Sequence, residues 1–176
     1  MIALKNTDIG FDTPLFSIEE TAFGKGKVHV LLGKNGVGKS ALLSTISGLI
    51  SPAVGSLTLE GKLLSDYSFK HLAKKIAYVR SNVTEVPFLT VDAFLLLGRY
   101  HYKTFLGGHS GEDYALIQKA KDLFGIAHLS EKFTNELSSG ELHLCAIAKA
   151  YVQQTDYILL DEPTSHLDYA NKRKVY

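Results

Sequence analysis

Residues 137–168 read LSSGELHLCAIAKAYVQQTDYILLDEPTSHLD, and this stretch decides the fold class. Its first part combines a Ser-Ser-Gly-Glu start with an apolar run of helical period. The apolar segment Tyr157–Leu160 then reads as a buried strand, and it ends in the adjacent carboxylates Asp161 and Glu162. A helix, a buried strand and an acidic strand end together indicate an α/β sheet, in which ligands bind at the carboxyl ends of the strands.

The segment from Gly33 to Ser40 reads GKNGVGKS and matches the pattern of a phosphate-binding loop. An apolar central strand is predicted before it, over 27–32, and an amphipathic helix after it, over 39–50. Lys39 would bind the β- and γ-phosphates, and Ser40 would bind Mg²⁺. A glycine-rich turn that carries a lysine by chance would not supply this context on both sides. The predicted nucleotide-binding residues are Gly33, Lys34, Asn35, Gly36, Val37, Gly38, Lys39, Ser40 and Ala41.

Asp161 and Glu162 have separate predicted roles at the end of their strand. Asp161 is expected to contribute to the Mg²⁺ shell through a water molecule. Side chains alternate along a strand, so Glu162 points elsewhere, where a carboxylate can orient an attacking water or accept its proton. Two solvated carboxylates are the alternative, but they would not explain the apolar residues that precede them.

Composition and charge limit the classes of protein. The 176 residues are 45% hydrophobic and 21% charged, which suits one soluble domain with a core. The net charge of +1 gives no field that attracts nucleic acid, so no nucleic-acid partner is predicted. Cys145 is the single cysteine, which excludes an intrachain disulfide and fits a reducing compartment. A cytoplasmic location is predicted because no signal-peptide pattern and no apolar run of about 18 residues occurs.

The remaining segments alternate between strand and helix patterns. Strands are expected at 15–18, 56–62 and 76–79, and a short helix at 69–75. From about 90 to 129 the pattern becomes helical. This alternation predicts an α/β fold with a helical insertion.

The motifs together resemble the ATP-binding subunit of an ABC transporter. The Walker A motif is Gly33 to Ser40, the signature is Leu137 to Glu141, the Walker B motif is Ile158 to Glu162 and the D-loop is Ser165 to Asp168. The resemblance implies a P-loop NTPase fold of the RecA-like type. Such a fold has a mostly parallel sheet core, an N-terminal antiparallel β-subdomain and an α-helical signature subdomain. It implies one domain over 1–176, with a nucleotide-binding core at 1–80 and 153–176 and the helical subdomain with the signature helix at 81–152.

A closer likeness connects the chain to the ATPases of iron–siderophore, haem and cobalamin importers. It is carried by Thr90-Val91, Leu97 to Tyr100, Gly107, Glu112-Asp113 and Leu123 to Ile126. It implies ATP hydrolysis coupled to import of an iron chelate, haem or cobalamin. The implied partners are ATP with Mg²⁺, a second copy of the chain, integral membrane permease subunits and, indirectly, a substrate-binding protein. The implied location is peripheral, at the cytoplasmic face of the inner (plasma) membrane.

In this family two subunits pair head to tail, and the signature of one contacts the nucleotide of the other. The residues implied to act on the partner's nucleotide are Ser138, Ser139, Gly140, Glu141 and Asp168. Ser138 and Glu141 also form the pattern of a helix-capping box, and the two roles are compatible. Phe11 occupies the place of the ring that stacks on adenine, with apolar packing at a strand end as an equal alternative.

Three departures from the family pattern affect these expectations. Ser81 stands where the family usually has a glutamine that reaches Mg²⁺ and the attacking water. We expect Ser81 to act there through a water, or Asn82 after a one-residue shift. Ser139 replaces the first signature glycine, and it can keep the backbone contacts if its φ is negative. The strand that carries the family's switch histidine is absent before Tyr176, so we expect a shortened form or a fragment with weak or no ATP hydrolysis.

Two other classes of protein stay open. A non-transport ABC ATPase that acts on ribosomes or DNA would share the ATP site. Its usual marks are a second cassette, a coiled-coil insertion or a basic arm, and the sequence has none of them. A P-loop kinase or GTPase would lack the signature.

Overall fold

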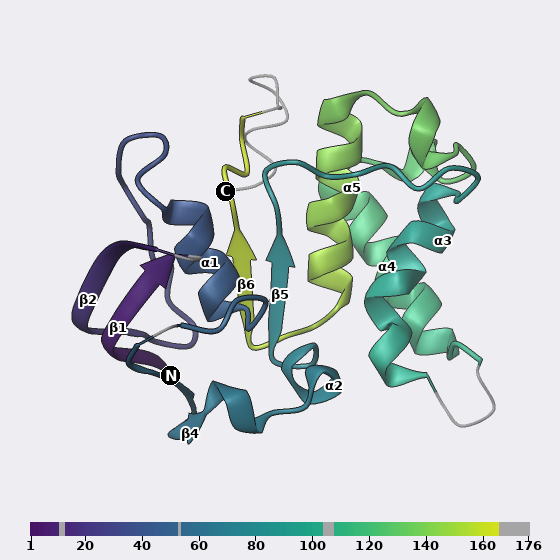
Figure 1. Ribbon diagram of the computed structural model, residues 1–176. Coiled ribbons are helices and arrows are strands. Elements are labelled where there is room, and N and C mark those ends of the chain that lie inside the picture. The colour runs from purple at the N-terminus through teal and green to yellow at the C-terminus, as the bar shows by residue number, and fades with distance from the viewer. Residues whose placement is uncertain (11–12, 53, 104–107, 166–176) are drawn as a thin grey trace.

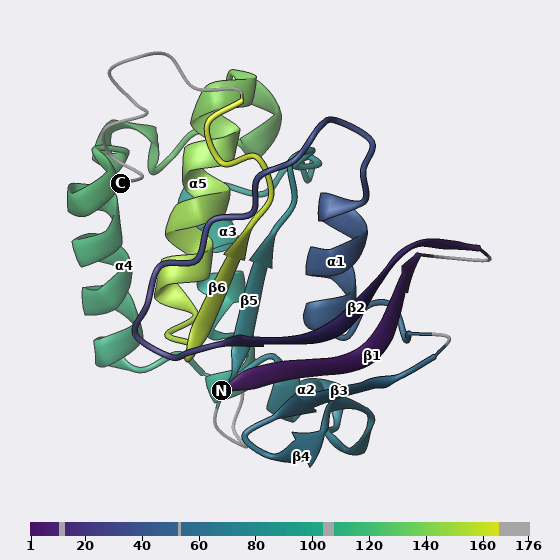
Figure 2. The ribbon, with the colours of Figure 1, turned by 90° about the vertical axis from the view of Figure 1, so that its left-hand side faces the viewer.

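The computed structural model describes residues 1–10, 13–52, 54–103 and 108–165 of the chain (Figure 1). It contains a four-stranded antiparallel sheet in the order β2-β1-β3-β4 and a two-stranded parallel sheet of β5 and β6. Helices cover both faces of the parallel sheet (Figures 1 and 2). The predicted fold class, α/β with an N-terminal antiparallel part, is therefore confirmed.

The antiparallel sheet is formed mainly by the first quarter of the chain. Its strands are β1 (Ile2–Gly10), β2 (Pro14–Phe23), β3 (Ser56–Leu59) and β4 (Lys62–Leu63). β1 lies in the middle, and its Ile2 faces Phe23 of β2 and Leu59 of β3. Apolar residues that alternate along the strands form one buried face, which packs against α1 (Lys39–Ile46).

The parallel sheet lies at the centre of the molecule, between α1 on one face and α5 (Ser139–Val152) on the other (Figures 1 and 2). β5 (Ile76–Val79) and β6 (Tyr157–Leu160) pair in register from Ile76↔Tyr157 to Val79↔Leu160. Alternate residues of these strands enter two different hydrophobic clusters. Ile76 belongs to the cluster on the α1 side, whereas Ala77 and Val79 belong to the cluster on the α5 side.

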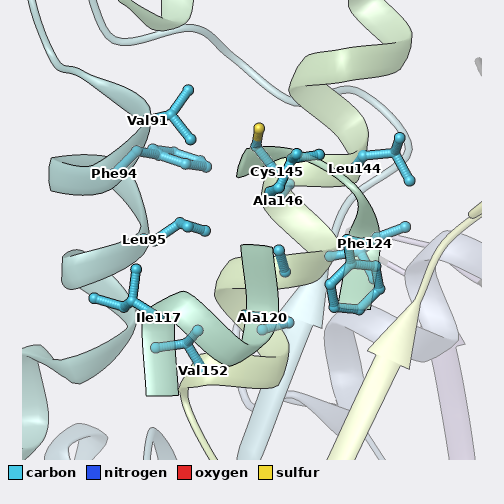
Figure 3. Close-up of a cluster of buried hydrophobic side chains, with 14 of the residues drawn as sticks. Val91, Phe94, Leu95, Ile117, Ala120, Phe124, Leu144, Cys145, Ala146 and Val152 are labelled. Atoms are coloured by element: carbon cyan, nitrogen blue, oxygen red, sulfur yellow. The ribbon is translucent and has the colours of Figure 1, made fainter. Parts of the chain in front are cut away.

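The helical part packs around α5. Its other elements are α3 (Val91–Leu96), a 3₁₀ segment (Leu97–Tyr102) and α4 (Gly111–Phe124), and the shorter α2 (Phe69–Leu72) lies before β5. Further 3₁₀ turns occupy Leu64–Asp66, Ala127–Leu129 and Thr134–Glu136. Figure 3 shows the side chains of α3, α4 and α5 that meet in the buried cluster, including Phe94, Ile117 and Leu144. Cys145 lies within it, and burial raises the pKa of its thiol to about 12, so it is a structural thiol.

One buried ion pair ties three parts of the helical region together. The Nε of Arg99 donates to Asp113 Oδ1 over 2.6 Å, and its Nη1 donates to the carbonyl oxygen of Val152 over 3.1 Å. Asp113 Oδ2 accepts the backbone N–H of Ser110, which completes a capping box at the start of α4. The Arg99 guanidinium also stacks on Tyr102, 3.9 Å from the ring centre. Arg99 thus connects the 3₁₀ segment, the start of α4 and the end of α5.

The central strand predicted over 27–32 is not observed, and this prediction was wrong. The segment has no strand assignment, and Val28, Val30 and Leu32 are 92%, 72% and 90% exposed. A strand requires a neighbour to share its backbone hydrogen bonds, and among the described residues no strand pairs with this segment. Apolar sequence without such a neighbour stays extended and exposed.

The helix after the phosphate-binding loop is shorter than predicted. It ends at Ile46, whereas the sequence pattern continued to Ile50. Gly48 takes a left-handed conformation with φ +79, and its N–H donates to the carbonyl of Thr45. The N–H of Leu49 donates to the carbonyl of Ser44. These two bonds form a Schellman motif, which stops the helix before its apolar pattern ends.

Candidate functional site

The phosphate-binding loop joins the exposed segment after β2 to the first turn of α1. Gly36 and Gly38 have φ values of +79 and +106, a region that glycine enters without steric cost. Gly38 is the N-cap of α1, and its carbonyl accepts the N–H of Leu42 over 2.9 Å. Phe16 of β2 packs directly against the loop, and a Cβ at Gly38 would lie only 2.8 Å from its ring. Glycine is therefore required at position 38 for two separate reasons.

Lys39 folds back across this loop. Its Nζ donates to the carbonyl oxygens of Gly33 and Lys34, each over 2.9 Å. The ammonium group is thereby held at the mouth of the loop, and Ser40 follows it in the first turn of α1. The helix N-terminus adds a partial positive charge at the same place. The arrangement offers an anion a lysine, a helix end and a glycine-rich backbone.

The carboxyl ends of β5 and β6 bring the predicted catalytic residues to one edge of the sheet. Val79 pairs with Leu160, and the carbonyl of Val79 accepts the N–H of Asp161 over 2.9 Å. Ser81 and Glu162 each follow two residues after this pair, so both lie at the same edge. Asp161 is 4% exposed, whereas Glu162 is exposed, which agrees with the expected divergence of the two carboxylates.

Glu162 has an unusual backbone conformation, with φ +48. Few non-glycine residues adopt this region, and such conformations are enriched at functional sites, although Asn6, Glu60, Phe88 and Gln154 also have positive φ. The carbonyl of Glu162 accepts both the N–H and the hydroxyl of Ser165, over 3.1 and 2.9 Å. A tight turn therefore fixes the backbone of Glu162 directly after the strand.

Tyr78 connects the loop helix to the buried carboxylate. Its hydroxyl lies 3.5 Å from Asp161 Oδ2 and 3.4 Å from the hydroxyl of Ser44 on α1. Burial raises the pKa of Tyr78, the contact with Ser44 opposes this, and the nearby Asp161 carboxylate raises the pKa further. Tyr78 is therefore a neutral hydrogen-bonding group between the two elements.

The hydroxyl of Ser40 and the carboxylate of Asp161 are oxygen donors of the kind that suits a magnesium ion. Mg²⁺ prefers hard oxygen ligands and keeps several waters or substrate phosphates in its shell. Across residues 1–10, 13–52, 54–103 and 108–165, no group of three or more histidine, cysteine or acidic side chains could hold a metal by itself. Ser40 and Asp161 would supply two oxygen donors to such an ion, and the phosphates of a bound nucleotide would supply others.

The start of α5 forms a second polar site. The hydroxyl of Ser138 accepts the N–H of Glu141, and Glu141 Oε2 accepts the N–H and the hydroxyl of Ser138 over 2.8 and 2.7 Å. These hydrogen bonds lower the pKa of Glu141. The predicted capping box is confirmed. Ser138 and Ser139 are exposed, and Ser139 is not among the described residues with positive φ, as its backbone role requires.

The sequence profile of the ABC transporter family matches residues 20–165. This range includes the phosphate-binding loop, the start of α5 and the acidic end of β6. The chain belongs to the ABC transporter family.

Curated relatives in the ABC transporter family are ATP-binding proteins. The chain is 35% identical over 147 residues to the ferric enterobactin transport ATP-binding protein FepC of Escherichia coli (strain K12), covering 84% of this chain and 54% of FepC. It is 34% identical over 151 residues to the iron(3+)-hydroxamate import ATP-binding protein FhuC of Bacillus subtilis (strain 168), covering 86% and 56%. The chain thus spans about half the length of these relatives.

Solved structures of ABC proteins share the fold. An inward-facing ABC transporter that has been assigned to the metal-chelate type matches with a TM-score of 0.77 and 30% identity, over 99% of this chain and 64% of that chain. An ABC transporter ATP-binding protein from Pyrococcus furiosus matches with a TM-score of 0.83 and 24% identity, over 99% and 81%. No helix in the described part of the chain is long and apolar enough to cross a membrane.

The structure brings some of the predicted ABC motif residues together and leaves others apart. The Walker A helix and the Walker B carboxylate Asp161 are linked through Tyr78, whose hydroxyl contacts both Ser44 and Asp161. The signature residues lie separately, at the start of α5 (Figure 1). Phe11 and Asp168 lie outside the described residues. The catalytic roles assigned to Ser81 and Glu162 stay predictions.

Two residues near the Walker motifs were missed by the sequence reasoning. Phe16 contributes to a small pocket of about 220 Å³ beside the loop, which is also lined by Leu31, Leu32, Val37, Lys39 and Leu42. Only the tertiary fold places β2 there. Tyr78 carried a signal that could have been used, because it is the one polar side chain in the apolar run Ile76–Val79.

Proposed function

We propose that the chain is the ATP-binding and ATP-hydrolysing subunit of an ABC importer for an iron chelate. The observation that carries this proposal is the buried Asp161 at the carboxyl edge of the sheet, which Tyr78 links to Ser44 on the helix of the phosphate-binding loop. The relatives that transport ferric enterobactin and iron(3+)-hydroxamate favour an iron chelate over haem or cobalamin.

Each residue of the loop and the strand edge has a part in this function. Lys39 exchanges its loop carbonyls for the β- and γ-phosphates of ATP, and the backbone of Gly33–Ser40 surrounds them. Ser40 would bind Mg²⁺ directly and Asp161 through a water molecule, and the ion would neutralise phosphate charge. Glu162 orients the attacking water, and Ser81 or Asn82 contacts it from the neighbouring strand end.

The nucleotide-binding site is completed by a second copy of the chain. The pocket beside the loop, about 220 Å³, is smaller than the roughly 300–1,000 Å³ of a typical ligand site. A single chain therefore covers ATP on one side only and leaves its other side open to solvent. The first turn of α5, where Ser138 and Ser139 are exposed and Gly140 and Glu141 are partly exposed, supplies the second wall from the partner. Asp168, which lies outside the described residues, keeps the same predicted role.

The membrane subunits bind the helical part of the chain. Leu97 and Tyr100 are 47% and 61% exposed and lie beside a second pocket of about 230 Å³, which is also lined by Leu89, Ala93, Leu96, Lys103 and His109. An apolar groove with a polar rim suits a short helix of a permease. In this proposal the chain lies at the cytoplasmic face of the membrane, and it communicates with the substrate-binding protein only through the permease.

Two alanine variants test the two halves of the nucleotide site. Lys39→Ala should lose most ATP affinity, because it removes the charge that binds the phosphates. The Ser138→Ala variant should still bind ATP as a single chain, but two variant chains should no longer pair when ATP is added. Affinity is measured by titration with a fluorescent ATP derivative, and pairing by light scattering with ATP and without it.

Ser110→Ala is the matched control for Ser138→Ala. Both serines cap a 14-residue helix through a capping box, so each substitution should cost about 1 kcal/mol of folding free energy. Only Ser138→Ala should also abolish pairing. Equal pairing by both variants would contradict the dimer, and ATP binding by Lys39→Ala would contradict the nucleotide site. Capture of a polytopic membrane protein by the tagged chain separates an importer from a ribosome- or DNA-directed ATPase.

A further inference from the structure

The buried carboxylate Asp161 has one side-chain hydrogen-bond partner among the described residues, and that partner is Tyr78. The Tyr78 hydroxyl donates to Asp161 Oδ2 over 3.5 Å. A carboxylate that is 4% exposed has little water to hold its orientation. The tyrosine hydroxyl is therefore the protein group that limits rotation of this carboxylate.

The direction of the hydrogen bonds extends this contact to α1. A tyrosine hydroxyl has one hydrogen, and a carboxylate can only accept. When Tyr78 donates to Asp161, the hydroxyl of Ser44, 3.4 Å away, must donate to Tyr78. Ser44 lies one helical turn after Ser40 and so on the same side of α1. A chain of hydroxyls thus runs from the helix that carries one predicted Mg²⁺ ligand to the carboxylate that is the other.

We propose that Tyr78 is a positioning residue that fixes the Asp161 carboxylate for Mg²⁺, with Ser44 fixing Tyr78 in turn. This inference rests on the proposed nucleotide site. Tyr78 does not contact the ion. It holds the distance between α1 and β6 with its ring and the angle of the carboxylate with its hydroxyl, and α1, β5 and β6 are adjacent elements in the fold (Figures 1 and 2).

Tyr78→Phe separates these two contributions, because it keeps the ring and removes the hydroxyl. A fluorescent N-methylanthraniloyl derivative of ATP is bound to the full chain in EDTA, and Mg²⁺ is then titrated against the complex. Nucleotide affinity in EDTA should equal that of the wild-type chain. The Mg²⁺ concentration at half-saturation should rise about threefold, the loss expected for one weak hydrogen bond to a charged group.

Two further variants keep the test decisive. Tyr67→Phe is the matched control, since the Tyr67 hydroxyl donates to the carbonyl of Leu59 in the antiparallel sheet, and its Mg²⁺ titration should not change. Ser44→Ala removes the hydroxyl on α1 that contacts Tyr78. It should shift the Mg²⁺ midpoint in the same direction as Tyr78→Phe. Ser44→Ala decides the matter if circular dichroism shows that Tyr78→Phe is unfolded.

The outcomes distinguish this inference from the proposed function. If the wild-type chain binds the nucleotide neither in EDTA nor with Mg²⁺, the proposed nucleotide site and this inference are both wrong. If it binds normally and Tyr78→Phe or Ser44→Ala has the wild-type Mg²⁺ midpoint, the inference alone is overturned. An equal loss of affinity in EDTA and in Mg²⁺ also overturns it, because that result indicates a purely structural role.

Discussion

At the scale of single residues, Arg99 shows why an arginine is used in the interior of the helical part. Its side chain is 14% exposed and makes two hydrogen bonds in different directions while stacking on Tyr102. The planar guanidinium can satisfy Asp113, the Val152 carbonyl and the aromatic face together. Lysine has one compact charge and cannot make all three contacts.

Arg99→Lys should therefore destabilise the chain, although the charge is kept. We expect a loss of about 1–2 kcal/mol, the value of one or two hydrogen bonds to charged groups in a buried site. Urea unfolding followed by circular dichroism measures it. Arg80→Lys, at an exposed position, is the control and should change stability by less than about 0.5 kcal/mol. Equal stabilities of the two variants would refute the role of the guanidinium.

At the scale of elements, the contact between the 3₁₀ segment and α5 depends on the absence of a side chain. A Cβ at Gly98 would lie 2.7 Å from the carbonyl oxygen of Lys149. This atom belongs to the backbone of α5 and cannot rotate away. Gly111, the first residue of α4, has open space in the direction of its Cβ.

Gly98→Ala and Gly111→Ala should consequently have opposite effects. Gly98→Ala should cost about 1–3 kcal/mol, because the helices must separate to admit the methyl group. Gly111→Ala should be neutral or stabilise α4 by up to about 1 kcal/mol, since alanine is the better helix former. Chemical unfolding of both variants measures the pair. A Gly98→Ala protein as stable as wild type would show that the packing is looser than the structure indicates.

The elements also show which features could be predicted from the sequence. The capping box of Ser138 and Glu141 was predictable because its partners are three residues apart. The strand over 27–32 was mispredicted because a strand depends on a neighbour that local sequence does not reveal. Tyr78 could have been noticed as a polar residue in an apolar run, but its role could not, since its partners Ser44 and Asp161 are distant in the chain and meet only in the folded protein.

At the scale of the whole molecule, four charged residues join the two sheets near the start of β5 and β6. Lys75 Nζ donates to Asp156 over 2.9 Å and to Glu60 over 3.1 Å, and Lys25 also donates to Asp156. Hydrogen bonds from Lys25 and Lys75 lower the pKa of Asp156. Hydrogen bonds to Asp156 and Glu60 raise the pKa of Lys75 to about 12.

Asp156→Asn should change the pH dependence of stability. Because the pKa of Asp156 is lowered by folding, its contribution is complete above its unfolded pKa of about 4 and is lost as the pH falls through the lower folded value. The contribution of Lys75 is complete below 10.5 and is lost as the pH rises through about 12. The difference in unfolding free energy between wild type and variant should therefore be largest at neutral pH.

Urea unfolding at pH 7 and near pH 3 tests this expectation. The stability difference should shrink at the acid pH, and it should also shrink in about 1 M salt, which screens partly exposed charges. A difference that is the same under all three conditions would contradict the ionic origin of the effect.

The central pair of strands has a consequence for cooperativity. Ile76 belongs to one hydrophobic cluster, and Ala77 and Val79 belong to the other. The short strand β5 therefore contributes side chains to both clusters. Melting of the helices around α5 would leave one face of β5 without support, and melting of the antiparallel sheet and α1 would do the same to the other face. The two halves of the chain should therefore unfold in a single transition, although each has a cluster of its own.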